Sequence, residues 1–441
     1  MQTGLPAGSG VLSEPGTLTV VKVRRKRMVC YEFDTGATSG DLALRYLVVI
    51  DGSVVRTNDD MPRTLGARNR KITVAVDAGS KVGLFLNSDV HPDFRRHPVY
   101  AVQVGENDVH VTITERKGRI GHESAELGLP DRQKLVDVYT AALTGDIWMK
   151  ISNLYAEHEA DAMLPADTDA TVRDAVRRIY KGLSSRELVV QFPASDSAPK
   201  QTLRVRFDEA DNVLENTTHC PLLTGVLPRV HPRAYAALLT EARASGVTTL
   251  RVTSGWRPML GSIAHRAGLG LDINYAESDT QQVHINRAAL TNTKLKRNDN
   301  VSERERELYA KYEQAKKEDE DKKKELKTAQ DQLEHNRESK AITVLQQEVA
   351  SAEARAENSR KVTIEAAKEW NEERDQHEPT LIRTLRDKLS HNKSINQVLD
   401  PWYVDTNTQD RIVAVPNEHR SENEKTHNNH LHITVTEPKI L

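Results

Sequence analysis

The chain has 441 residues, of which 37% are hydrophobic and 29% charged, a balance that indicates a packed part diluted by a highly charged part. The length predicts about three domains, and the formal net charge of −2 argues against a protein that binds nucleic acid or an anionic membrane, since both need a basic surface. The two cysteines, Cys30 and Cys220, exclude a disulfide scaffold and a Cys-rich zinc module, and they leave open one disulfide or two free thiols.

The N-terminal part of the chain has the pattern of strands. Residues 1–18 are rich in Gly, Pro, Ser and Thr, which predicts a flexible tail. Between residues 19 and 118, apolar and polar residues alternate in runs that turn signals separate, as expected of half-buried strands. The runs are Ala43–Ile50, Ile72–Val76, Val82–Leu86, Tyr100–Val104 and Val109–Thr114, and the turn signals include Gly105-Glu106-Asn107. We therefore predict a small β domain over residues 19–118.

Residues 119–218 predict a linking region of helices and one strand pair. Apolar residues recur at spacings of three and four over Lys134–Lys150 and Asp167–Lys181, which is typical of helices with one buried face. Alternation returns in Glu187–Phe192 and Thr202–Phe207, which predicts two paired strands.

A third domain is predicted over residues 219–441. Pro232 suits the first position of a helix over residues 232–245, and Gly246 suits its end. Residues 247–254, which follow that helix, are predicted to form a strand.

A charged segment over residues 299–377 interrupts this domain. It contains no Gly or Pro, and apolar residues are sparse among runs of Lys and Glu. We predict an inserted helical hairpin that turns near His335–Ser339. Its apolar positions are too few for a strong coiled coil, so a solvated hairpin is the simpler interpretation and an arm that binds a specific partner is the alternative.

Histidine, aspartate and arginine side chains in three short segments suggest a metal site. His265 and Asp272 flank a Gly-containing run that leads into an apolar strand. His430 and His432 are two residues apart, so on a strand both face the same side. A catalytic zinc takes three such ligands and keeps a fourth position for water. The set therefore offers His, Asp and His as ligands and one further His for proton transfer, and Arg257 could stabilise a developing oxyanion or bind a substrate carboxylate.

Each pair alone is more often a surface pair than a metal site, but the joint pattern resembles a known family. The first motif is Ser254-Gly255-Trp256-Arg257. The second is the spacing of His265, Gly268 and Asp272, and the third is His427-Asn428-Asn429-His430-Leu431-His432. They resemble the D-alanyl-D-alanine metallopeptidase superfamily, and the last motif is similar to the HxxHxH ending of its murein endopeptidase branch rather than to ExWH. The resemblance covers about residues 220–277 and 400–435. Two departures are Gly270, where the family usually has Ala, and Ser262, which stands one residue out of register.

The resemblance implies an α+β fold with a small C-terminal zinc-peptidase core, built of an antiparallel sheet and flanking helices. It implies a Zn²⁺ cofactor held by His265, Asp272 and His432. It also implies His430 as general base and later general acid, Arg257 as a catalytic residue that binds and polarises the substrate, and His427 and Ser254 beside substrate or ligands. The implied activity is hydrolysis of peptidoglycan stem peptides or cross-links by a D,D-endopeptidase or carboxypeptidase.

The remaining expectations concern delivery and partners. No apolar run approaches the about 20 residues of a membrane-spanning helix, and the N-terminus lacks a signal-peptide pattern. We expect a protein made in the cytoplasm that acts in the periplasm or cell wall after delivery, as an injected antibacterial effector of a type VI-like system with an immunity or carrier protein as partner. Alternatives are a phage lysis or tail enzyme, a cellular murein hydrolase, a non-catalytic peptidoglycan-binding protein and a scaffold protein.

Overall fold

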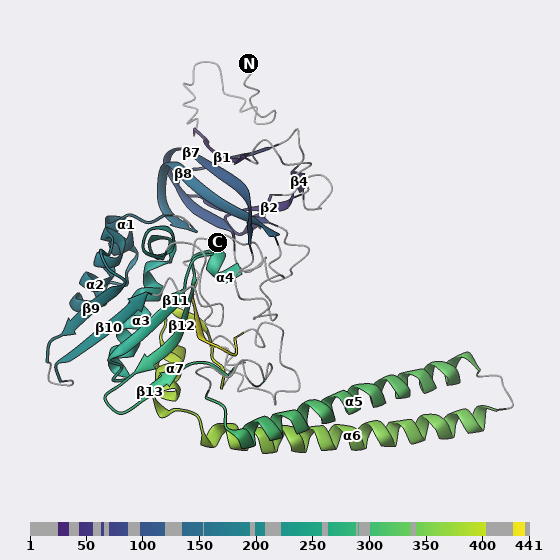
Figure 1. Cartoon of the computed structure of the whole chain (residues 1–441). Coiled ribbons are helices and arrows are strands. Elements are labelled where there is room, and N and C mark those ends of the chain that lie inside the picture. The colour runs from purple at the N-terminus through teal and green to yellow at the C-terminus, as the bar shows by residue number, and fades with distance from the viewer. Residues whose placement is uncertain are drawn as a thin grey trace, which may run out of the picture.

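A computed structural model describes most of the chain. The described residues are 25–34, 44–55, 63–65, 70–86, 98–119, 135–152, 154–194, 199–207, 222–257, 263–287, 290, 300–336, 341–402 and 427–436. The predicted tail over residues 1–18, Cys220 and Ser262 lie outside them. The fold is α+β, as expected: an N-terminal sheet, a C-terminal sheet with flanking helices, and a long helical hairpin that projects away from both (Figure 1).

The N-terminal sheet contains eight strands within the described residues. They are β1 (Arg27–Asp34), β2 (Leu44–Ile50), β3 (Ser53–Val54), β4 (Arg63–Leu65), β5 (Lys71–Val76), β6 (Lys81–Leu86), β7 (Tyr100–Arg119) and β8 (Leu135–Ile151). The order is β3-β2-β6-β7-β1-β5, with β4 on β2 and β8 on β7. Alternation places Val29 and Tyr31 of β1 in a core and leaves Met28 exposed. The sheet is mixed, because β1 and β7 are parallel and the other pairs are antiparallel.

The predicted helix over Lys134–Lys150 is wrong, because this segment forms β8. β8 pairs with β7 over most of its length, and Ala141 and Leu143 face inward while Ala142 and Thr144 are exposed. Leu and Ala at spacings of three and four favour a helix locally, but pairing with a long neighbouring strand outweighs such weak propensities.

The predicted turn at Gly105-Glu106-Asn107 is also wrong. These residues lie inside β7, where the register with β8 shifts between Val104 and Val109. The Glu106 N–H donates to Asp146 Oδ2 over 2.5 Å, so the extra residues form a bulge that β8 holds in place. Gly and Asn therefore mark an irregularity in one strand rather than the end of a strand.

The C-terminal sheet contains seven strands within the described residues. They are β9 (Glu187–Phe192), β10 (Gln201–Phe207), β11 (Thr249–Ser254), β12 (Gly270–Glu277), β13 (Gln282–His284), β14 (Ile395–Leu399) and β15 (Leu431–Val435). The order is β14-β15-β12-β11-β10-β9, with β13 on β12, and all neighbours are antiparallel except β10 and β11. The strands predicted over residues 187–192, 202–207 and 247–254 thus lie in one sheet.

Helices pack beside this sheet and share its core. They are α1 (Glu157–Met163), α2 (Ala170–Lys181), α3 (Pro232–Ala244) and α7 (Thr380–His391), with short helical turns at Leu222–Val226 and Leu227–Arg229. A further short helix, α4 (Ile263–Arg266), packs against β12. The helices predicted over residues 167–181 and 232–245 are confirmed as α2 and α3. Asp169 caps α2 by accepting the N–H groups of Thr171 and Val172, which explains where that helix begins.

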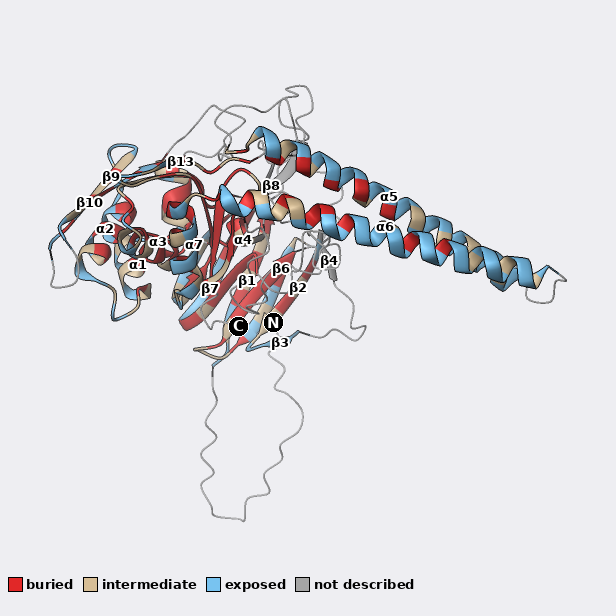
Figure 2. Ribbon diagram, turned by 90° about the horizontal axis from the view of Figure 1, so that it is seen from below, coloured by how far each residue is buried: buried red, intermediate tan, exposed pale blue. Residues whose placement is uncertain are grey.

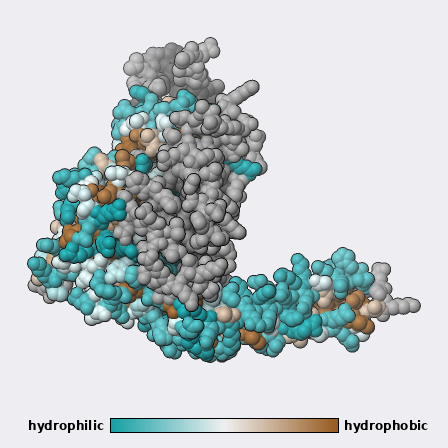
Figure 3. Space-filling model, in the orientation of Figure 1, coloured by the Kyte–Doolittle hydropathy of each residue, from teal (hydrophilic) through white to brown (hydrophobic). Residues whose placement is uncertain are grey.

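The inserted segment forms the predicted hairpin of α5 (Glu303–His335) and α6 (Ile342–Gln376), although residues 337–340 of the expected turn lie outside the described part. Most of its surface is exposed and hydrophilic (Figures 2 and 3). Its apolar contacts form a separate small cluster of Leu308, Tyr312, Ala315, Ala366, Ala367 and Trp370. Among the described residues, no helix is long and apolar enough to cross a membrane.

Candidate metal centre

Three buried side chains from three elements converge on one point. His265 comes from α4, Asp272 from β12 and His432 from β15, and none is more than 5% exposed. Asp272 Oδ1 lies 3.2 Å from His265 Nε2 and 2.7 Å from His432 Nδ1. One donor atom from each residue lies within 4.8 Å of the others. The arrangement could hold a metal ion, because two imidazole nitrogens and a carboxylate oxygen face a common centre.

Backbone pairing explains how residues so distant in sequence meet. β12 and β15 are antiparallel neighbours, and Asp272 stands directly opposite His432 in their register. Gly268 returns the chain from α4 into β12 with a φ of +73°, and its N–H donates to the His265 carbonyl over 2.9 Å. A Cβ atom at Gly268 would lie 2.3 Å from the Arg229 carbonyl oxygen. Only glycine fits this position, since both the backbone angle and the space exclude a side chain.

Gly270 leaves room for the two imidazole rings. A Cβ atom there would lie 3.0 Å from atoms of both His265 and His432. The rings themselves stand 4.9 Å apart between centroids. This glycine therefore lies directly beside two of the candidate ligands.

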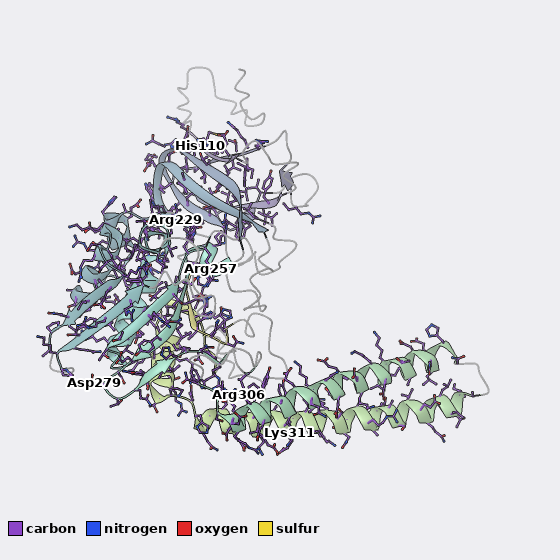
Figure 4. The ribbon with its side chains drawn as sticks, in the orientation of Figure 1. His110, Arg229, Arg257, Asp279, Arg306 and Lys311 are labelled. Carbon is purple, nitrogen blue, oxygen red and sulfur yellow. The ribbon has the colours of Figure 1, made fainter. Side chains whose placement is uncertain are left out.

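Arg257 and Ser254 hold the second oxygen of the carboxylate. Arg257 Nη2 donates to Asp272 Oδ2, and Arg257 Nε donates to Ser254 Oγ over 2.7 Å. Ser254 stands opposite Asp272 in the register of β11 and β12 and is fully buried. Figure 4 labels Arg257 near the end of β11, between the two sheets. Both residues therefore lie behind the candidate ligand and orient it, and the direct contact of Arg257 with substrate remains a prediction.

The electrostatics favour the protonation states that a metal requires. Burial, followed by the positive charge of Arg257, lowers the pKa of His265 to about 4. Burial of Asp272 acts to raise the pKa of its carboxyl, but His265, His430 and Arg257 outweigh it and hold that pKa well below its usual range. Neutral imidazole and ionised carboxylate are the forms that bind metal ions.

His430 and His427 lie beside the cluster. His430 Nε2 is 3.5 Å from Asp272 Oδ1, and its Nδ1 is 2.6 Å from Asn429 Oδ1. Burial lowers the pKa of His430 to about 3, so its ring is neutral near pH 7 and free to accept a proton, but it is a weak base in this environment. His427 is only half-buried, and its ring centroid is 5.0 Å from those of both His430 and His432. These three histidines form a second possible ligand set that shares His432 with the first.

Some contacts of the centre involve groups that the sequence motifs did not single out. His432 Nε2 lies 2.8 Å from Thr434 Oγ1, and His265 Nδ1 contacts the Gly255 carbonyl. Thr434 could have been found from the sequence, because residues two apart on a strand share a face. No sequence pattern indicates the contact of His265 with the Gly255 carbonyl or that of His430 with Asn429.

Comparison of the chain with protein-family models, with curated proteins and with solved structures found no match. The resemblance to the metallopeptidase superfamily therefore stays a prediction based on the three motifs. The geometry itself establishes a buried His/Asp cluster that could bind a metal ion.

Proposed function

We propose that the protein is a zinc-dependent hydrolase of peptide bonds in peptidoglycan stem peptides or cross-links. The observation that carries the proposal is the convergence of His265, Asp272 and His432 on one buried point beside the half-buried His427. Three protein ligands with an accessible side are typical of a catalytic zinc, whereas structural sites are closed by four. The choice of substrate class rests on the motif resemblance.

Different residues would bind the metal ion and transfer the proton in the proposed reaction. His265 Nε2, Asp272 Oδ1 and His432 Nδ1 would hold the ion, which when bound acts as a Lewis acid and lowers the pKa of a water ligand to about 7. Donation of a proton from His430 Nδ1 to Asn429 Oδ1 leaves Nε2 as a proton acceptor facing the cluster. His430 then takes a proton from the attacking water and returns it to the leaving amine.

Arg257 supports this chemistry from behind the ligands. Together with His265 and His430, its guanidinium holds the pKa of Asp272 low, and its hydrogen bond fixes the direction of the carboxylate. Outer contacts of this kind raise metal affinity and set ligand orientation. Polarisation of the substrate carbonyl by the same side chain is part of the proposal, and it requires that the guanidinium also reach the bound peptide.

The first test measures metal content and activity in matched variants. The purified protein should carry about one zinc ion per chain, and His265→Ala should lose most of it because one of three ligands is gone. His430→Ala should keep the zinc but lose about 10²–10⁴-fold in rate, as expected for a general base. The zinc content is measured by inductively coupled plasma mass spectrometry. The rate is measured from the release of muropeptides from sacculi.

The control is His158→Ala, which removes an exposed histidine of α1 far from the cluster in sequence and should change neither quantity. Full zinc occupancy in His265→Ala would contradict the ligand assignment. Zinc binding without any released muropeptide would instead favour a non-catalytic peptidoglycan-binding protein. Loss of metal in His430→Ala but not in His432→Ala would mean that these two histidines exchange roles.

A further inference from the structure

A fully buried guanidinium joins the base of the hairpin to the segment that carries His427 and His430. Arg287 follows β13 and is 0% exposed. Its guanidinium contacts the hairpin, whereas its backbone N–H contacts the histidine segment. We propose that Arg287 is a positioning residue that couples the hairpin to these two histidines. The expected effect on catalytic activity rests on the proposed hydrolase function, but the coupling itself does not.

Both helices of the hairpin converge on Arg287 through one carboxylate. Glu305, near the start of α5, is fully buried and accepts a hydrogen bond from Arg287 Nη2. Trp370 of α6 donates its Nε1–H to the same Glu305 oxygen over 3.1 Å and stacks on Tyr312 with ring centroids 5.5 Å apart. Arg306, labelled in Figure 4, marks this end of α5. A displacement of either helix therefore acts on the Arg287 side chain.

On the other side, Arg287 fixes the backbone beside the metal centre. Its N–H donates to the Asn428 carbonyl over 2.7 Å. Asn428 follows His427 directly, and the next residue, Asn429, contacts His430 Nδ1. A shift of residue 287 thus moves a peptide group that lies between the two histidines.

The guanidinium has little freedom to absorb such a shift. It lies over the Trp402 ring at 5.1 Å from the centroid, and its Nη1 donates to the Asn300 carbonyl over 3.1 Å. A side chain held on several sides by packing and hydrogen bonds transmits displacement, because packed interiors have low compressibility. The hairpin, although solvated for most of its length, is thereby connected to the proposed general base.

The test compares two Glu→Gln variants by NMR of ¹⁵N-labelled histidine side chains in the full-length, metal-free protein. Glu305→Gln removes the charge that faces Arg287, whereas Glu369→Gln removes a half-buried charge that pairs with Lys311, nearly two helical turns beyond Glu305. Glu305→Gln should shift the ring resonances of His427 and His430 and leave that of His231 in place. Glu369→Gln should shift none of them. Unchanged His427 and His430 resonances in folded Glu305→Gln would overturn the proposal, as would equal shifts in both variants.

A second variant keeps the test decisive if Glu305→Gln disturbs folding, since loss of one partner leaves an unpaired buried charge. The double variant Arg287→Met, Glu305→Met replaces the pair by apolar side chains, a change that is often tolerated. It should show the same histidine shifts, and their absence would overturn the proposal. In the zinc-loaded enzyme, kcat should fall roughly tenfold with KM unchanged, by analogy with outer contacts of metal sites. Because the NMR arm needs neither zinc nor substrate, it still decides the coupling if the hydrolase proposal fails.

Discussion

Gly268 shows how a single residue can control the candidate centre. Its positive φ and the nearby Arg229 carbonyl leave no room for a side chain. We predict that Gly268→Ala lowers the free energy of unfolding by about 2–4 kcal/mol, because backbone strain and a steric clash add. Gly246→Ala is the matched control: φ is +71°, but no atom lies near its missing Cβ. Urea unfolding of both variants measures the difference, and equal losses would show that the clash contributes nothing.

His231 makes stability depend on pH. Burial, followed by the charge of Arg233, lowers the pKa of His231 from 6.5 to about 3. Between these two pH values the unfolded chain binds a proton that the folded protein excludes, so stability falls as pH decreases through that window. The fall is at most about 1.4 kcal/mol per pH unit, or about 2 kcal/mol between pH 6.5 and pH 5.

We therefore predict that, between pH 7 and pH 5, the free energy of unfolding falls by about 2 kcal/mol less in His231→Asn than in the wild type. Asn keeps an acceptor for the Arg233 N–H at the start of α3, where it is a good cap. Urea unfolding at the two pH values measures the difference. The other buried histidines act equally in both proteins, so identical pH slopes would mean that His231 is protonated in the folded state.

At the scale of elements, the sequence predicts those whose signals are local. It does not predict those that depend on pairing with a distant strand. α2 and α3 were predicted within a few residues, because each has a buried face within its own segment and Pro232 marks the start of α3. β8 was not, because its strand conformation depends on β7, which no local pattern reveals. Likewise the ligand motifs identify His265, Asp272 and His432, but the contact of Arg257 with Asp272 follows from the pairing of β11 with β12.

α4 is held by the N-terminal sheet. Arg266, next to His265, is buried, donates from Nη2 to the Tyr100 hydroxyl over 2.9 Å and accepts the Ser152 hydroxyl at its carbonyl. We predict that Tyr100→Phe lowers zinc affinity on the order of tenfold, because the helix that carries a candidate ligand loses an outer contact. Competition with a chromophoric chelator measures the affinity.

The matched control is Tyr235→Phe, which removes a buried hydroxyl that donates to the Leu227 carbonyl. It should lower stability without changing zinc affinity. If both variants bind zinc as the wild type does, the N-terminal sheet has no influence on the centre.

At the scale of the whole molecule, the proposed function predicts where the protein is harmful. Peptidoglycan lies outside the inner membrane of a Gram-negative cell, so an injected effector should be toxic in the periplasm and harmless in the cytoplasm. We predict growth arrest when the wild type carries an added signal peptide, and none for His265→Ala with the same signal. Growth curves at equal expression measure this, with both proteins lacking the signal as controls. Toxicity of the wild type without a signal would point to a cytoplasmic target.

The hairpin also bears on the order in which the chain folds. Asp272 and His432 are separated by 160 residues, and such distant pairing is slow because a long loop must close first. Helices form on a timescale of about a microsecond, and the hairpin brings Ser302 within 3.1 Å of Glu373, 71 residues later. Early formation of the hairpin would remove this stretch from the loop that β15 must close. We therefore expect the charged arm to speed the last step of folding, in which β15 adds His432 and completes the centre.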